Sequence, residues 1–186
     1  MNIAVLGGRF DPPHIWHFWT CQQVLENIKG IDQVWYMPDK ANAFRPIATS
    51  YDERAEMLRF METGRLRLST MAFMGPSVTY TIDIVRELNK NTSNKYFWMV
   101  GSDIMSEVNR WREYQKLSKI IQFLVFPRKD YPIKSMPAGF QRVPGHLLLS
   151  NVSSSLIRER VKADLPIKGL VFPEIEKYIK ERKLYK

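Results

Sequence analysis

The chain has 186 residues, 45% of them hydrophobic, which is enough for one domain with a sizeable core. A single cysteine excludes an internal disulfide, and no apolar run approaches the roughly 18–20 residues of a membrane-spanning helix. The 28 basic and 19 acidic residues give a net charge of +9, which favours anionic partners. Because no signal peptide is recognisable, we expect a cytoplasmic protein without membrane contacts.

Strand-like and helix-like segments alternate along the chain, as judged from the spacing of apolar residues. In the first half of the chain the pattern predicts a strand at 2–7, a helix at 15–28, a strand at 34–37, a loop at 39–49 and a helix opened by the Ser50–Glu53 capping box. A strand at 66–70 and a helix at 81–88 follow. In the second half it predicts strands at 96–100, 120–126 and 146–149, a helix opened by Ser153 and a helix starting at Pro173. We expect an α/β fold, a parallel sheet with helices on both faces.

Three polar segments follow predicted strands of this sheet. They begin at Gly7, at Gly101 and at Ser150. In open parallel sheets ligands bind at the carboxyl ends of the strands, near the point where the strand order reverses. The sequence therefore predicts one crevice that gathers all three segments.

The first segment, residues 7–17, reads Gly-Gly-Arg-Phe-Asp-Pro-Pro-His-Ile-Trp-His. A strand, a glycine turn and a helix place free backbone N–H groups and the positive helix end against a phosphate. His14 and His17 share one face of the first helical turn and can bond phosphate oxygens. No third ligand stands nearby, so we expect no metal bound by the protein itself.

The second segment, residues 152–160, reads Val-Ser-Ser-Ser-Leu-Ile-Arg-Glu-Arg. Serines at a helix start cap it and leave N–H groups open to an anion. Arg158 lies one turn further along and offers a bidentate guanidinium. A serine cap is usually only structural, but together with the first segment it predicts a second phosphate contact.

The two segments resemble the paired signatures of the nucleotidyltransferase superfamily, a His-x-Gly-His segment and a Ser-Ser-x-x-Ile-Arg segment. Residues 79–83 (Thr-Tyr-Thr-Ile-Asp), residues 101–103 (Gly-Ser-Asp) with Trp111, and Leu184-Tyr185 make the chain more similar to the nicotinate (nicotinamide) mononucleotide adenylyltransferase family. The resemblance covers nearly the whole chain. It implies a single Rossmann-like nucleotidyltransferase domain over residues 1–186, with the helices of 153–186 included.

The resemblance implies transfer of the adenylyl group of ATP to nicotinate mononucleotide, or to nicotinamide mononucleotide, with Mg²⁺ and release of pyrophosphate. It assigns catalysis to His14, His17 and Arg158. The ATP-binding residues would be Gly7, Gly8, Arg9, Phe10, His14, His17, Gly101, Asp103, Ser153, Ser154, Ser155 and Arg158. The mononucleotide would contact Thr79, Tyr80, Thr81 and Trp111, with Trp111 stacked on the pyridine ring.

The chain departs from the family at three places. Trp16 stands where the family has glycine, at what we take to be the edge of the motif, and Arg9 stands where a small polar residue is common. The family's Pro-Pro-His-Lys loop is absent, and Lys40 or Arg45 would supply its cation. These departures keep alternatives open: another nucleotidyltransferase, of the phosphopantetheine or cytidylyl type, or a nucleotide-binding module without turnover.

The charge and the sequence pattern bear on two further kinds of partner. The basic surplus alone would also suit a nucleic-acid-binding protein, but no stretch is dense enough in Lys and Arg for a nucleic-acid arm, so we expect no such partner. The pattern leaves the oligomeric state open, a homo-oligomer included.

Overall fold

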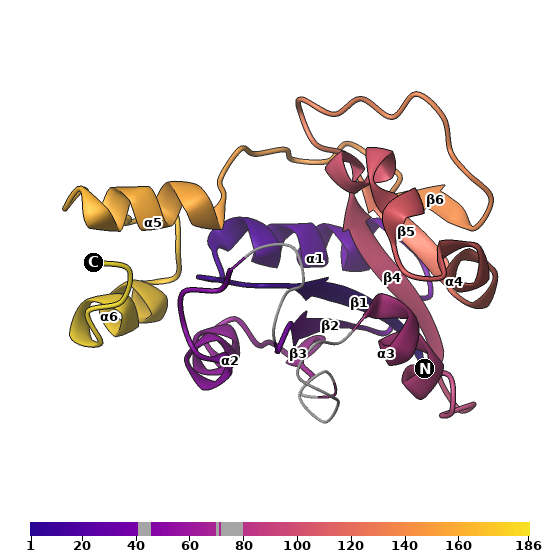
Figure 1. The fold of residues 1–186 in the computed structure, drawn as a ribbon, viewed down its shortest axis with the longest axis horizontal. Helices are drawn as coiled ribbons and strands as arrows, with labels where there is room; N and C mark the ends of the chain where they lie inside the picture. Colours follow the sequence, from indigo (N-terminus) through magenta and orange to yellow (C-terminus); the bar gives the residue numbers. More distant parts are fainter. Residues whose placement is uncertain (41–45, 70, 72–79) are drawn as a thin grey trace.

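The fold, a computed structural model, describes residues 1–40, 46–69, 71 and 80–186. Its centre is a six-stranded parallel sheet in the order β3-β2-β1-β4-β5-β6, which confirms the predicted α/β class (Figure 1). The strands are β1 (Asn2–Gly8), β2 (Gln33–Pro38), β3 (Leu66–Leu68), β4 (Lys95–Gly101), β5 (Gln122–Phe126) and β6 (Phe140–Arg142). The order reverses between β1 and β4, so that the switch point lies between these two strands.

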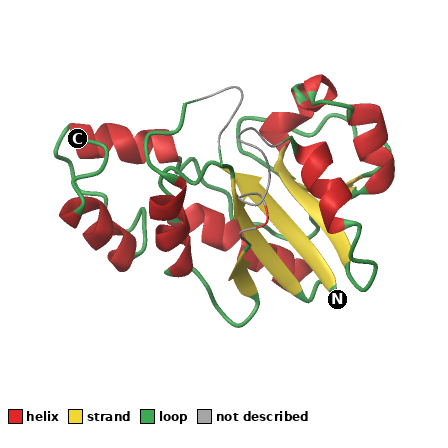
Figure 2. Cartoon of the chain, turned by 60° about the horizontal axis from the view of Figure 1, so that its bottom comes forward, coloured by secondary structure: helices red, strands yellow, loops and turns green. Residues whose placement is uncertain are grey.

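Helices cover both faces of the sheet (Figure 2). They are α1 (Ile15–Asn27), α2 (Tyr51–Arg59), α3 (Thr81–Leu88), α4 (Tyr114–Ile120), α5 (Ser154–Lys162) and α6 (Pro173–Glu181), with short 3-10 turns η2 (Ser102–Ser106) and η3 (Val108–Arg110). The predicted capping box opens α2: Ser50 Oγ accepts from the Glu53 N–H, and the Glu53 carboxylate accepts from the Ser50 N–H.

Alternate side chains of each central strand belong to two separate hydrophobic cores, one on each face of the sheet, as expected for strands buried on both faces. On one face Ala4, Tyr36 and Met99 pack with residues of α1, α2, α5 and α6. On the other face Val5 and Trp98 pack with residues of α3 and α4. In Figure 1 α5 and α6 lie at one end of the molecule and α4 at the other. None of the helices in the described ranges has the length and apolar character that crossing a bilayer requires.

Three sequence expectations about the elements are wrong. Residues 146–149 form no strand, because the backbone N–H and C=O of Leu148 are bonded to the side-chain amide of Gln23 on α1. The sixth strand is β6 instead, within a stretch for which the sequence pattern predicts no strand, and there Phe140 stacks on Phe123 of β5 with ring centroids 4.3 Å apart. Ile120 ends α4 rather than starting a strand, and α4 itself was not foreseen because only Leu117 of its residues is buried.

Candidate functional site

The candidate site lies at the carboxyl ends of β1 and β4, where two glycines allow very close packing. A Cβ added to Gly7 would come within 2.6 Å of the Trp98 ring. At Gly101 an added Cβ would meet the Asp103 carboxylate and, at 3.1 Å, Nε of Arg128. At Gly7 the rigid Trp98 ring therefore leaves no room for a side chain, whereas at Gly101 the flexible Asp103 and Arg128 side chains would have to move.

The turn of residues 9–13 joins β1 to α1 and is fixed by hydrogen bonds. Phe10 has a left-handed backbone with φ of 50°, yet its side chain is almost fully buried. A non-glycine residue in this region is strained by about 1–3 kcal/mol and persists only where its surroundings determine it. Arg54 of α2 helps to fix the backbone of this turn, since its guanidinium donates to the carbonyl of Arg9 at 2.7 Å.

His14 and His17 form a compact stacked pair at the start of α1. Their ring centroids are 3.7 Å apart, with planes inclined by 25°, and Phe10 meets His17 edge-on at 4.8 Å. The backbone N–H of His14 donates to Nδ1 of His17 at 3.1 Å. In the neutral imidazole the proton of His17 is therefore on Nε2, which can serve as a hydrogen-bond donor.

Both histidines are held in the neutral form. Burial, reinforced by the positive charge of Arg128, lowers the pKa of His14 to about 3. Burial, then His14 and then Arg128 lower the pKa of His17 well below its usual value. Nδ1 of His14 is buried without a hydrogen-bond partner. Near neutral pH the unliganded pair is thus uncharged, whereas an anion placed beside it would favour protonation.

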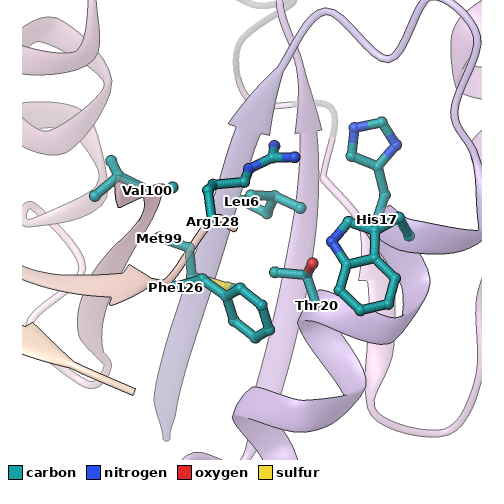
Figure 3. A pocket seen from close by; sticks show the side chains of 9 residues that line it. Leu6, His17, Thr20, Met99, Val100, Phe126 and Arg128 are labelled. Carbon is teal, nitrogen blue, oxygen red and sulfur yellow. The ribbon is translucent and has the colours of Figure 1, made fainter. Parts of the chain in front are cut away.

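A small pocket opens beside His17, between α1 and the ends of β1, β4 and β5. Its volume is about 40 Å³, and its lining includes Trp16, Thr20, Gly101 and Arg128. Figure 3 shows the Arg128 guanidinium and the His17 imidazole on the same side of this pocket. A volume of this size suits a water molecule or two, not a purine ring, since ligand pockets usually measure 300–1,000 Å³.

Trp16 corrects a sequence expectation. It is only 7% exposed and belongs to the hydrophobic core, with its ring edge-on to Phe126 at 6.3 Å. The indole therefore does not lie at the edge of the motif, as predicted, but packs inward and forms part of the pocket wall. An aromatic side chain placed here buries a large apolar area and occupies space that glycine would leave open.

Asp103 and Arg128 face each other on the β4–β5 side of this edge. Nε of Arg128 lies 3.5 Å from Oδ1 of Asp103, and this oxygen is buried without a hydrogen-bond partner. Ser102 orients the segment that carries Arg128, because its hydroxyl accepts from the Arg128 N–H and donates to the carbonyl of Tyr131. A carboxylate oxygen without a hydrogen-bond donor can accept a hydrogen bond from a hydroxyl or amide group of a ligand.

The N-terminus of α5 lies against the 9–13 turn, so that the two sequence motifs do meet. Ser153 caps α5 by accepting from the Leu156 N–H, as predicted. Ser154 donates to the carbonyl of Pro12 at 2.8 Å, and Arg158 donates to the carbonyl of Asp11 at 2.6 Å and to the Ser155 hydroxyl. Ser154 and Arg158 thus hold the first motif in this structure, and a phosphate-binding role for them stays a prediction.

Three of the residues predicted for the mononucleotide, Tyr80, Thr81 and Trp111, lie on the side of α3 and α4. Tyr80 precedes α3, Thr81 begins it, and the guanidinium of Arg112 covers the Tyr80 ring at 4.8 Å. Trp111 is half-buried and meets Phe123 edge-on, which leaves part of its indole open. Lys40 follows β2 and is half-buried. Thr79 and Arg45 lie outside the described residues, and a mononucleotide role for any of this set stays a prediction.

Sequence reasoning missed Arg128 and Arg112. Arg128 follows β5 by two residues, so the rule that located the other strand ends would have found it. Arg112 is next to Trp111 and pairs with Asp83 at 3.5 Å. The half-buried Arg9 donates to the carbonyl of Pro46 at 3.4 Å. In the part of the chain that the structure describes, no three His, Cys, Asp or Glu side chains gather as a metal site.

A parallel sheet with a histidine pair at its switch point and a second helix N-terminus against the preceding turn is the arrangement of a nucleotide-binding α/β protein. Residues 5–160 match the model of the cytidylyltransferase-like family. A solved structure entitled "Plasmodium falciparum nicotinic acid mononucleotide adenylyltransferase complexed with NaAD" has the same fold, with a TM-score of 0.82, 19% identity and coverage of 99% of this chain and 97% of that one.

Two curated relatives are similar over their full lengths. The nicotinate-nucleotide adenylyltransferase of Bacillus subtilis is 32% identical, covering 99% of this chain and 98% of the relative. A protein of Shouchella clausii named "Probable nicotinate-nucleotide adenylyltransferase" is 34% identical, covering 99% of this chain and 96% of the relative. The chain belongs to the nicotinate-nucleotide adenylyltransferase family, within the cytidylyltransferase-like group.

Proposed function

We propose that the chain transfers the adenylyl group of ATP to nicotinate mononucleotide, as the names of its relatives describe for them. A phosphate oxygen of the mononucleotide attacks the α-phosphorus of ATP. The bond from this phosphorus to the oxygen that bridges the α- and β-phosphates breaks, and pyrophosphate leaves with the bonding pair. The stacked His14–His17 pair at the start of α1, on the switch point of the sheet, is the observation that carries the proposal.

Positioning and charge neutralisation are what such a transfer needs most from a protein. Nε2 of His17 donates to a phosphate oxygen, and the negative charge of the phosphate raises the pKa of both imidazoles toward the protonated form. Arg128 adds fixed positive charge on the same side of the small pocket as His17 (Figure 3). The N–H groups at the start of α5, with Arg158, receive the departing phosphates.

On the mononucleotide side, Trp111 offers the open part of its indole to the pyridine ring. The free Oδ1 of Asp103 accepts from a ribose hydroxyl. ATP arrives with a divalent cation, Mg²⁺ in our proposal, held mainly by phosphate oxygens and water. Asp11 has both carboxylate oxygens occupied, whereas the Asp103 side chain is 36% exposed and would contact a water of the hydrated ion through its second oxygen, Oδ2. When bound, the cation offsets charge on the phosphates.

The test is pyrophosphate release by the purified chain with ATP, Mg²⁺ and one acceptor at a time. We expect release and a new dinucleotide with nicotinate mononucleotide, and we compare the nicotinamide form, 4′-phosphopantetheine, and CTP with glycerol 3-phosphate. No release with either pyridine mononucleotide would overturn the proposal. Release only with one of the other acceptors would assign the chain to the phosphopantetheine or cytidylyl branch.

A second candidate, nucleotide binding without turnover, is favoured by one observation. The indole of Trp16 leaves a pocket of only about 40 Å³ beside His17. Calorimetric binding of ATP with no pyrophosphate released from any acceptor would support this candidate over the enzyme.

A further inference from the structure

The Asp11 carboxylate is buried and fully occupied by donors from distant parts of the chain. Its side chain is 1% exposed. Oδ2 accepts from the Ala48 N–H at 2.6 Å, while Oδ1 accepts from the Thr49 hydroxyl at 2.7 Å and from the Tyr185 hydroxyl at 2.9 Å. A buried carboxylate needs such partners, because leaving it unpaired is costly.

Tyr185, four residues beyond the end of α6, reaches this carboxylate through an unusual backbone. Lys183 and Tyr185 both have left-handed φ values, 52° and 64°. Between them the N–H of Leu184 donates to the carbonyl of Ile179 and holds the segment to α6. Non-glycine residues in this conformation are strained and are retained only where the surrounding structure determines them.

The Tyr185 hydroxyl acts as a permanent donor. The residue is 9% exposed, and burial raises the pKa of its phenol far above the usual value, so the proton stays on the oxygen. Its acceptor, Asp11, is the middle residue of the 9–13 turn. That turn also receives Arg54, Ser154 and Arg158 at its backbone carbonyls. The segment after α6 thus completes a ring of donors around the turn that leads into the histidine pair.

We propose that Tyr185 is a positioning residue: its hydroxyl, together with that of Thr49, orients Asp11 and thereby keeps the 9–13 turn in the shape that receives nucleotide phosphates. The ordering of the turn is inferred from the hydrogen bonds that Thr49 and Tyr185 donate to Asp11. Its consequence for the reaction rests on the proposed function.

Matched variants separate positioning from general stability. Tyr185→Phe and Thr49→Val each remove one donor to Oδ1 of Asp11 with little change of shape. Tyr178→Phe is the control, since this α6 tyrosine contacts Phe60 and Arg182 with its ring and is not part of the Asp11 network. If Tyr185→Phe does not fold, Thr49→Val carries the test alone.

The first readout is amide hydrogen exchange, which needs no activity. We expect exchange within residues 7–14 to become at least about tenfold faster in Tyr185→Phe and in Thr49→Val, and to be unchanged in Tyr178→Phe. Exchange in β4 should not change. Unaltered exchange in residues 7–14, or an equal increase in β4, would overturn the proposal whether or not the chain is an adenylyltransferase.

The second readout is steady-state kinetics with ATP and nicotinate mononucleotide. Because a displaced turn misaligns the reacting phosphates, we expect kcat to fall by at least about tenfold, with KM for ATP changed less than threefold. Faster exchange with an unchanged kcat would reduce Tyr185 to a purely structural role. If the wild-type chain releases no pyrophosphate, the proposed function fails, and the exchange result still decides whether Tyr185 orders the turn.

Discussion

The histidine side of the site and the α3–α4 side are held by different forces. The 9–13 turn is fixed by buried hydrogen bonds to α2, α5 and the segment after α6. On the other side, α3 and α4 pack onto the sheet through apolar residues, and the polar side chains at the surface of the site are joined by ion pairs between partly exposed groups, Arg112 with Asp83 and Arg86 with Glu113. Such pairs contribute little to stability and are weakened by salt. We expect changes on the first side to alter stability and kcat, and changes on the second side to alter substrate KM.

The largest expected effect is on stability, from Trp16→Gly. Removing a buried indole leaves a cavity and costs about 3–5 kcal/mol. Trp19→Gly in the same helix is the control, because Trp19 is 38% exposed and Trp16 only 7%. Urea unfolding measures both losses of free energy. Equal losses in the two variants would show that Trp16 is not core.

A kinetic change tests the histidine side directly. His17→Ala removes a phosphate donor, and we expect kcat to fall by at least about 100-fold, the usual scale for a donor that stabilises developing charge. The exposed His146 supplies the control variant His146→Ala, which should keep the wild-type rate. A folded His17→Ala variant with wild-type kcat would remove His17 from the mechanism.

The buried histidines also predict how stability depends on pH. The pKa of His14 is about 3 in the folded chain against 6.5 when unfolded, so between these values only the unfolded chain binds the proton. The free energy of unfolding should therefore be highest above pH 6.5 and fall as the pH drops, by about 2 kcal/mol at pH 5 for His14. Urea unfolding at pH 7 and pH 5 measures this loss, and His14→Asn should reduce it. A loss that is the same in His14→Asn and wild type would contradict the neutral buried state.

The smallest expected effect lies on the other side of the site. Trp111→Ala should raise KM for nicotinate mononucleotide about tenfold, the scale of one ring-stacking contact, and leave KM for ATP unchanged. Trp111→Phe should recover most of the affinity. Equal changes in both KM values would mean that the indole supports the whole site rather than one substrate, and that the two sides are not separable.

Local signals predicted the elements that are long or clearly capped. Residues 81–88 carry an apolar stripe, Ser50 with Glu53 gives a capping box, and both helices begin where expected. The prediction of short elements failed because the stability of such elements comes from tertiary contacts. β6 has three residues and depends on the stacking of Phe140 on Phe123. Leu148 looks like part of a strand in the sequence, but its backbone bonds to a helix side chain.

The site was predictable wherever it follows from topology, and not where it depends on distant partners. Parallel strands bring Gly7 and Gly101 to one edge, which the strand pattern alone implies. The bond between Asp11 and Tyr185 joins residues 174 positions apart, and no local pattern reports it. The direction of the Trp16 indole is also a packing result, decided by the space beside Phe126.

Gln23 helps to place the N-terminus of α5 beside the 9–13 turn. Its amide accepts from the N–H of Leu148 and donates to the carbonyls of Leu148 and Trp19, and it is almost fully buried. This clamp lies near the middle of residues 143–153, which connect β6 to α5. Halving a free loop spares the chain about 0.6 kcal/mol of closure entropy. At roughly 3.3–3.6 Å per residue, Ser153 can lie no further than about 18 Å from Leu148. The bonds of Gln23 to Leu148 therefore restrict the positions that the start of α5 can take before it packs beside Pro12.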